Sequence, residues 1–449
     1  MFDPSSAVPS GRSGMRLMSV LVFALVTGCG AVRPPPPPPP PHGEIPPGAR
    51  AAFGEALAAF LAHDRAGDWT PAVCRDVAAA FDVAFEAHGR RLASAAFNAG
   101  RTFERCGDHA QARDRYERAA RVEPAMPAAH VKAAVLAYKT GGDIDRAIAS
   151  VERVITRHAF WDPASLVELA TLQMTRDGGA PSGPCKDDRD CARLNLQRAL
   201  AIDDTYMPAL NQLALLYLKI ARHDAQGAPH VRRVSSGVTR TSGHVQQLEL
   251  AALVCSQAAR KDPTYAPIHN TAGLVMVELG QTNAAVESFA TATRLDPRLF
   301  EAHMNLAALN LSFRGFDHAE RAYRRALALR PDDYDAHIGL AVALRGPVTG
   351  SEADLASRIA AVKAVLSSAQ KIDRERPEAY FNMGVLEHEL GAPVGAPEPE
   401  LLAAYGRAEA QLGTFLEKAR GHAEYEGASG RARERLADIA SARAFVRAR

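Results

Sequence analysis

The sequence predicts an all-α fold built from repeated helical hairpins. The chain has 449 residues, too many for one compact core, and a 34-residue period runs through its middle. Alanine, the strongest helix former, is abundant, whereas aromatic residues make up 6% of the chain. The alternation of Val, Ile, Thr and Tyr that marks β-strands is nearly absent. A net charge of +2 gives no bias towards nucleic acid, so we expect no nucleic-acid partner.

The period is clearest in three consecutive units, which run from Ala266 to Leu299, from Phe300 to Asp333, and from Tyr334 onward. Within each unit, small residues fall at positions 8, 20 and 27, an aromatic residue at 24 and proline at 32. Position 8 is occupied by Gly273, Ala307 and Ala341, position 20 by Ala285 and Ala319, and position 27 by Ala292 and Ala326. Position 24 is occupied by Phe289 and Tyr323, and position 32 by Pro297 and Pro331. Small residues allow helices to touch, and proline ends the second helix of each unit.

These positions resemble the small, aromatic and proline positions of the tetratricopeptide repeat (TPR) family. The resemblance implies a helix–turn–helix pair in each unit, here called helix A and helix B. It also implies that the pairs form a right-handed solenoid. Stacking has a physical reason as well, because one hairpin cannot bury its own apolar face.

The pattern decays towards both ends of the chain and predicts about eight units. We expect six segments: a lipoprotein-type signal peptide (1–28), a lipidated cysteine with a proline-rich tether (29–48), a degenerate first helical repeat (49–92), TPR units with long turns between their helices (93–265), TPR units best matched at 266–333 (266–426), and a C-terminal capping helix (427–449).

The start of the chain is typical of an export signal, with Met15 as the expected first residue. Arg16 precedes the apolar run Leu17 to Val26, which is too short to span a bilayer. The following Thr27-Gly28-Cys29 looks like the end of a bacterial lipobox. That resemblance implies a covalent lipid on Cys29 and membrane attachment through it. The alternative is an ordinary signal peptide with a chance cysteine.

Two features after Cys29 bear on localisation. Gly30 stands where an Asp commonly retains lipoproteins in the inner membrane, so we expect an outer-membrane protein that faces the periplasm. Pro34 to Pro41 form a run of prolines, which adopts extended polyproline II. Such a run makes a stiff spacer of roughly 25 Å. A proline-rich partner motif is the alternative.

The TPR resemblance implies that partners bind on the concave face, which helix A lines. The candidate residues there are Asn270, Leu274, Val277, Met304, Ala308, Leu311, Ile338, Val342, Phe381 and Val385. The face is mainly apolar and lacks the lysines with which some TPR proteins grip a terminal carboxylate. It therefore favours an apolar helix or extended segment of a partner protein. The alternative is that these residues are half-exposed and bind nothing.

Two long turns separate helix A from helix B, at residues 176–191 and 221–247. The second turn is basic and contains Arg222, His223, His230, Arg232, Arg233, Arg240 and His244 against the single acid Asp224. It is either a contact for an acidic partner or a mobile solvated loop. A third insertion at 392–399 is expected to be a linker.

Cys185 and Cys191 bracket an acidic turn. An exported protein meets an oxidising compartment, so these two cysteines predict a local disulfide, with free thiols or a metal site as alternatives. The remaining cysteines, Cys74, Cys106 and Cys255, fall on predicted helices and are expected to be small core residues.

Histidines recur at position 4 of the repeats, as His130, His269, His303 and His337. Equivalent residues of successive repeats lie too far apart to share one ion, so these histidines predict packing rather than a metal site. His388-Glu389 lacks the second histidine of a zinc-protease motif. Without a phosphate-binding loop or a nucleophile elbow, the chain is expected to be no enzyme and to need no cofactor or metal.

The whole architecture resembles the TPR lipoproteins of the myxobacterial adventurous gliding-motility machinery, the GltE family. The features behind this resemblance are the lipobox, the proline-rich tether, the long turns, the insertion Cys185 to Cys191, and the stretch Phe415 to Ala419. It implies a scaffold that binds other envelope proteins in a motility complex. The alternatives are an outer-membrane TPR adaptor for secretion, pilus or cell-wall assembly, and an envelope hydrolase.

Overall fold

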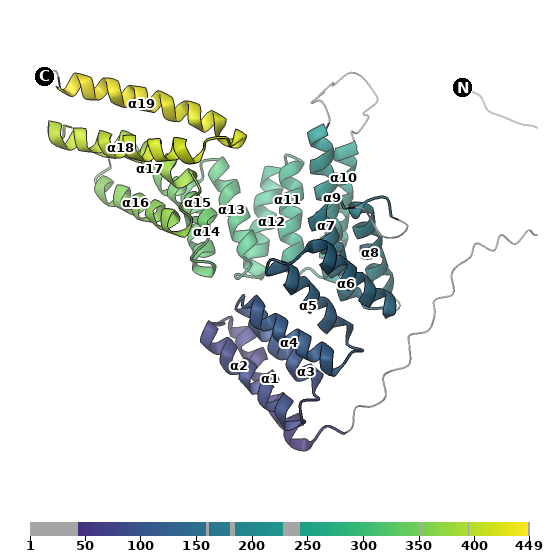
Figure 1. Ribbon diagram of the computed structural model, residues 1–449. Helices are drawn as coiled ribbons and strands as arrows, with labels where there is room; N and C mark the ends of the chain where they lie inside the picture. The colour runs from purple at the N-terminus through teal and green to yellow at the C-terminus, as the bar shows by residue number, and fades with distance from the viewer. Residues whose placement is uncertain are drawn as a thin grey trace, which may run out of the picture. The chain divides into compact units, whose positions relative to one another are not determined.

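Helical hairpins follow one another along the chain (Figure 1). The computed structural model describes residues 44–158, 161–179, 185–227, 243–350, 352–393 and 395–447. All described helices belong to one compact unit, residues 39–449. Within the described ranges the elements are 19 α-helices and a short 3-10 helix, without any strand. This confirms the predicted all-α fold.

Eighteen of the described helices form nine hairpins, compared with the expected number of about eight. The pairs are α1 (Pro47–Ala66) with α2 (Pro71–Ala87), α3 (Ala93–Arg105) with α4 (His109–Val122), α5 (Pro127–Lys139) with α6 (Ile144–Arg157), α7 (Pro163–Arg176) with α8 (Asp188–Ile202), α9 (Met207–Gly227) with α10 (Gly243–Lys261), α11 (Ala266–Glu278) with α12 (Thr282–Leu295), α13 (Phe300–Ser312) with α14 (Phe316–Leu329), α15 (Tyr334–Arg345) with α16 (Leu355–Ile372), and α17 (Glu378–Leu390) with α18 (Glu398–Lys418). The 3-10 helix η1 (Ala423–Tyr425) and α19 (Glu426–Arg447) follow the last hairpin.

Local sequence signals set where the helices begin. Aspartate precedes several of them, and its side chain accepts the hydrogen bond of a backbone N–H that has no partner inside the helix. Asp108 accepts from the N–H of Gln111 at the start of α4, and Asp143 accepts from the N–H of Arg146 at the start of α6. Proline occupies the first turn of α1, α2, α5, α7 and α11, where its missing N–H costs nothing.

The short turns between helix A and helix B contain one residue in the left-handed conformation. In four hairpins that residue is glycine: Gly67, Gly107, Gly141 and Gly280, with φ of 70°, 71°, 95° and 72°. Glycine is suited to this position because it has no Cβ to clash with the backbone. The hairpin α13–α14 has Arg314 at the same place, with φ of 61°.

Small residues bring the helices into contact as the 34-residue spacing predicts. Ala285, Ala292, Ala319 and Ala326 are all 0% exposed. Phe289 fills the space beside them and is 1% exposed. Burial of an aromatic side chain of this kind stabilises the fold by about 2 kcal/mol. The buried apolar side chains of α5 to α11 form one continuous cluster, so the hairpins share a core across their boundaries.

The last helix, α19, packs along α18 and covers the end of the repeat array (Figure 1). Its Ala432 and Ile439 are buried in one cluster with Phe415 and Leu412 of α18. An apolar face that a tenth hairpin would otherwise cover is thereby removed from water.

Replacement of Gly273 by alanine should destabilise the protein. The added Cβ would lie 2.5 Å from Cδ1 of Phe289, which is too close for either group to remain in place. We expect the overpacking to lower the free energy of unfolding by about 1–3 kcal/mol, which exceeds the stabilisation that alanine's higher helix propensity provides. Urea unfolding followed by circular dichroism would measure it. Gly413→Ala on α18 is the matched control, because its Cβ would meet nothing within 4 Å, and it should stabilise the protein. Equal effects of the two substitutions would contradict this account of the packing.

Candidate binding surface

The candidate surface is the face formed by the A helices. A helices of neighbouring hairpins contact each other, as α5 does with α7 and α11 with α13. Neighbouring B helices make no comparable contact in the described ranges of the chain. The A helices therefore approach one another more closely than the B helices do, and their side chains form one continuous surface.

The residues predicted to line this surface differ in exposure. Val277 is 41% exposed and Ala308 is exposed as well. Val385 is buried. The other seven are half-buried: Asn270, Leu274, Met304, Leu311, Ile338, Val342 and Phe381. The surface that remains open to a partner is thus smaller than the sequence pattern alone indicates.

Several of the half-buried residues hold neighbouring hairpins together. Leu274 packs against the continuous cluster of α5 to α11. Met304 and Leu311 pack against the cluster around Tyr323, and Ile338 packs against the next cluster along the chain. Their outer edges face solvent while their inner atoms contribute to the core.

Phe381 is covered by the end of the array. Its ring lies 5.0 Å from the ring of Phe415 on α18, and the guanidinium of Arg431 on α19 lies over it at 5.8 Å. The closing helix therefore occupies the place where a partner would reach Phe381.

The side chain of Asn270 on α11 forms a hydrogen bond to the next hairpin. Its side-chain oxygen accepts a hydrogen bond of 2.9 Å from the amide of Asn305 on α13. A similar bond joins α9 to α11, where the hydroxyl of Thr271 donates to the Asn211 side-chain oxygen at 2.7 Å. These bonds satisfy polar groups along the A-helix face and fix the register of successive hairpins.

The surface extends to the earlier hairpins, which sequence analysis did not include. Lys132 on α5 lies between two acids, with its Nζ 2.9 Å from Glu168 on α7 and 3.6 Å from Glu104 on α3. Burial by itself would lower the pKa of Lys132, but the two carboxylates raise it above its ordinary value. This lysine is therefore charged and already paired on the face of the A helices.

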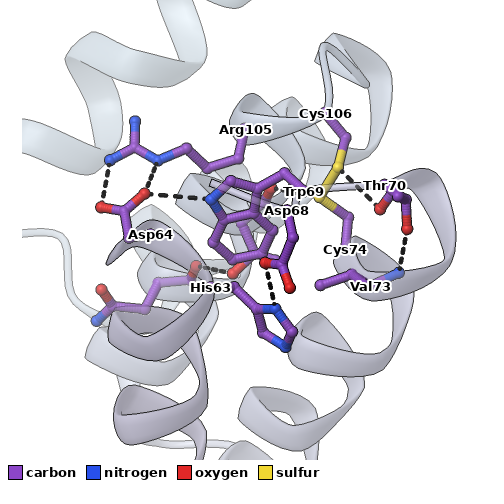
Figure 2. The surroundings of a disulfide bond; sticks show 11 residues. His63, Asp64, Asp68, Trp69, Thr70, Val73, Cys74, Arg105 and Cys106 are labelled. Atoms are coloured by element: carbon purple, nitrogen blue, oxygen red, sulfur yellow. Dashed lines mark hydrogen bonds and ion pairs between the residues drawn. A yellow bond between two sulfur atoms is a disulfide. The ribbon is translucent and has the colours of Figure 1, made fainter. Parts of the chain in front are cut away.

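Cys74 and Cys106 form a disulfide between the first two hairpins. The interpretation of both as small core residues was wrong: Cys74 is buried on α2, but its sulfur is bonded to Cys106 at the end of α3 (Figure 2). Helix periodicity assigns each cysteine to a helix, yet says nothing about which residue of a neighbouring hairpin it meets. Cys255 is buried without a disulfide, and burial raises the pKa of its thiol to about 12.

Charged and aromatic side chains surround this disulfide (Figure 2). Asp64 on α1 accepts two hydrogen bonds from Arg105 on α3, at 2.7 and 3.0 Å, and one of 3.2 Å from the indole N–H of Trp69. Burial alone would raise the pKa of Asp64, but the bonds from Arg105 and Trp69 lower it below its ordinary value. The first hairpin is thus joined to the second by a covalent bond and by an ion pair.

The structure also contains a disulfide between Cys185 and Cys191, at the start of α8. Beside it, the carboxylate of Asp188 is 1% exposed. It accepts hydrogen bonds from Arg176 at 2.6 and 3.1 Å and from the backbone N–H groups of Gly178 and Gly179 at 2.9 and 2.7 Å. Burial alone would raise the pKa of Asp188, but these donors lower it below its ordinary value of 3.8.

The recurrent histidines make a structural contact. Nε2 of His269 and of His303 lies 2.9 Å from the carbonyl oxygen of the preceding Pro263 and Pro297 respectively, and His130 lies 3.3 Å from that of Pro124. Each of these histidines thus links helix A to the end of the preceding helix B. His337 instead lies 2.9 Å from the carbonyl oxygen of Asp333.

Several predicted features lie outside the described residues. They are Cys29 with its lipid, Pro34 to Pro41, and residues 228–242 of the basic turn. The prediction of a turn over all of 221–247 was wrong at its two ends, because residues 221–227 belong to α9 and residues 243–247 to α10. Among the residues that are described, no group of three or more His, Cys, Asp or Glu side chains is placed to hold a metal ion. The same part of the chain contains no helix with the length and apolar character needed to cross a membrane.

Comparison with known proteins agrees with this geometry. The profile of the tetratricopeptide repeat family matches residues 92–162 and 311–346. The first segment covers the hairpins α3–α4 and α5–α6, and the second runs from the last residues of α13 to the end of α15. The described residues fold as an all-α solenoid of helical hairpins, and these two segments of it are tetratricopeptide repeats. No curated protein is significantly similar to the chain.

Solved structures of TPR proteins are similar to about half of the chain. TTC0263 of Thermus thermophilus is 27% identical, with a TM-score of 0.39, over 49% of this chain and 98% of that one. MamA of Desulfovibrio magneticus is 16% identical, with a TM-score of 0.33, over 46% and 97%. YrrB, described as a TPR protein with an unusual peptide-binding site, is 16% identical, with a TM-score of 0.33, over 51% and 93%.

Loss of the Cys74–Cys106 disulfide should destabilise the first hairpins more than loss of Cys185–Cys191 destabilises its turn. The sequence separations are 32 and 6 residues, so the longer loop gains more chain entropy in the unfolded state. We expect the free energy of unfolding to fall by about 4 kcal/mol when Cys74 and Cys106 are both replaced by alanine, and by about 2 kcal/mol when Cys185 and Cys191 are. Urea unfolding of the two double variants measures this difference. Free thiols at these positions in peptide mapping without reduction would refute both bonds.

Asp188→Asn should destabilise the hairpin α7–α8 in a pH-dependent way. The amide removes the buried counter-charge of Arg176, which keeps only its exposed partner Asp145, at a cost of about 2 kcal/mol at pH 7. Because the folded pKa of Asp188 lies below its unfolded value, its contribution is complete above about pH 4 and is lost as the pH falls through the folded pKa. Urea midpoints of the native and variant chains should therefore differ less at pH 3 than at pH 7. The same difference in urea midpoint at both pH values would show that the charge of the Asp188 carboxylate does not stabilise the fold.

Proposed function

We propose that the chain is a lipid-anchored scaffold of a bacterial outer membrane that binds other envelope proteins through its A-helix face. The observation that carries this proposal is the pair of disulfides, Cys74–Cys106 and Cys185–Cys191. Disulfides persist in oxidising compartments and are rare in the bacterial cytosol, which supports export. The lipobox-like sequence ending in Cys29 supplies the means of attachment.

The binding role rests on the TPR solenoid and on the exposed apolar residues of the A helices. Val277 and Ala308 lie on successive A helices, α11 and α13, which contact each other. Apolar residues on adjacent helices offer a helix or extended segment of a partner a continuous surface from which water is displaced. Such a scaffold contributes position and contact rather than chemistry.

Within the envelope, a gliding-motility complex is the setting that the sequence resemblance favours. The lipobox, the proline-rich tether and the insertion between Cys185 and Cys191 support that setting. An adaptor for secretion, pilus or cell-wall assembly is the second candidate. Deletion of the gene separates the two, because loss of gliding with normal pili and growth supports motility.

In-cell crosslinking of the tagged full chain, followed by mass spectrometry of the membrane fraction, tests the scaffold role. The double variant Val277→Asp with Ala308→Asp places two charges on the exposed part of the surface without entering the core. We expect it to lower the recovery of envelope partners about tenfold, because each charge would be desolvated in the complex. The matched control is Val83→Asp on the B helix α2, where Val83 is 60% exposed.

Equal recovery from the double variant and from the control would contradict binding at the A-helix face. Recovery of secretion or cell-wall components, lost in the double variant, would support the scaffold and overturn the motility setting. Cytosolic partners alone would overturn the envelope location.

A further inference from the structure

A small cleft lies between the seventh, eighth and ninth hairpins. Its volume is about 270 Å³, and its apolar walls come from Phe316 of α14, Ala341 and Val342 of α15, and Val362 and Leu366 of α16. Val362 and Leu366 are 1% exposed, so the walls belong to the rigid core. The cleft is large enough for one or two side chains of a partner.

Positive charge at this cleft exceeds negative charge. Arg345 lines the cleft, and its guanidinium is paired with Glu389 of α17. The same carboxylate is also bound by Arg435 of α19, at 2.7 Å. One carboxylate cannot neutralise two guanidinium groups, so the cluster of Arg345, Arg435 and Glu389 keeps a net positive charge.

Arg345 is also incompletely hydrogen-bonded. Its Nε is buried and has no hydrogen-bond acceptor among the described residues. Burial, together with the charge of Arg435, lowers the pKa of Arg345 below its ordinary value. Both observations indicate that this guanidinium lies in a site with too little negative charge and too few acceptors.

Arg314 contributes a second cation from the turn before α14. It lines the cleft, and its guanidinium lies 5.6 Å from the centre of the Phe316 ring. It occupies the left-handed turn position that is filled by Gly67, Gly107, Gly141 and Gly280 in four other hairpins. A side chain at this position costs free energy that glycine avoids. The turn itself therefore does not require an arginine, and the side chain of Arg314 adds a cation to the cleft.

We propose that this cleft binds a carboxylate side chain from an acidic segment of a partner protein, flanked by apolar residues. The inference rests on the proposed scaffold role and names the chemistry of the partner. Arg314 and Arg345 supply charge-assisted hydrogen bonds to the carboxylate, and Phe316 and Val342 pack against the neighbouring apolar side chain. The apolar walls favour a peptide over a phosphate group, whose hydration they would remove without compensation.

Fluorescence anisotropy with the purified full chain in detergent tests this proposal. The probes are three labelled peptides with the core sequences Leu-Glu-Leu-Glu-Leu, Leu-Gln-Leu-Gln-Leu and Leu-Lys-Leu-Lys-Leu. We expect the glutamate peptide to bind at least about fivefold more tightly than the other two, as a charge-assisted pair requires. Arg314→Gly should weaken this preference, because one of the two cations of the cleft is lost, and should raise the melting temperature, because glycine relieves the left-handed turn.

Two further variants complete the test. Arg314→Glu should abolish the preference, because its carboxylate cancels the net positive charge that Arg345, Arg435 and Glu389 retain. Arg374→Ala removes an exposed arginine from the turn between α16 and α17, outside the cleft lining, and should leave the preference unchanged. It is the matched control for loss of one positive charge.

Equal binding of the three peptides, or displacement of the glutamate peptide by low millimolar inorganic phosphate, would overturn the acidic-peptide site. An unchanged preference in Arg314→Gly would overturn the role of Arg314. Each of these results leaves the scaffold role intact if crosslinking still recovers envelope partners that depend on Val277 and Ala308. Loss of those partners with the peptide preference retained would instead count against the scaffold alone.

Discussion

Close contact between helices at small residues is the constraint on which the rest of this structure depends. Ala285, Ala292 and their counterparts one repeat later are fully buried, and each allows two helical backbones to approach without a gap. The aromatic residue at position 24 then fills the space that the small residues leave, as Phe289 does against Gly273. A single hairpin cannot satisfy both requirements, so each one needs its neighbours and the array needs a covering helix at its end.

The same constraint limits the surface that is left for binding. Along the A helices, residues such as Leu274 and Met304 serve the core with their inner atoms, and only their outer edges face solvent. Hydrogen bonds between hairpins, such as that from the Asn305 amide to the Asn270 side-chain oxygen, occupy polar groups on this face that a partner would otherwise bind. What remains open is a set of positions between these contacts, such as Val277 and Ala308. Recognition by this surface therefore depends on a few exposed side chains placed by a rigid framework.

The repeat spacing made the fold predictable because it reports contacts inside each hairpin and between adjacent hairpins, which recur every 34 residues. Features that occur once were not predictable in this way. The bond between Cys74 and Cys106 depends on the register of two hairpins, which no local pattern encodes. The pairing of Arg345 with Glu389 depends likewise on how α17 packs against α15. The candidate binding residues on helix A were assigned by resemblance to the TPR family, but how far each of them is buried could be seen only in the folded structure.

Departures from the repeat carry the most information about what this array does beyond folding. At the left-handed turn position, glycine satisfies the backbone in four hairpins, and Arg314 therefore replaces a residue that is better for folding. Arg345 likewise retains a buried nitrogen without an acceptor among the described residues, although an apolar side chain would avoid this cost. Both departures meet at one cleft with apolar walls, and both add positive charge to it. Two independent costs to stability in the same small volume are more simply explained by a negatively charged partner group than by the requirements of the fold.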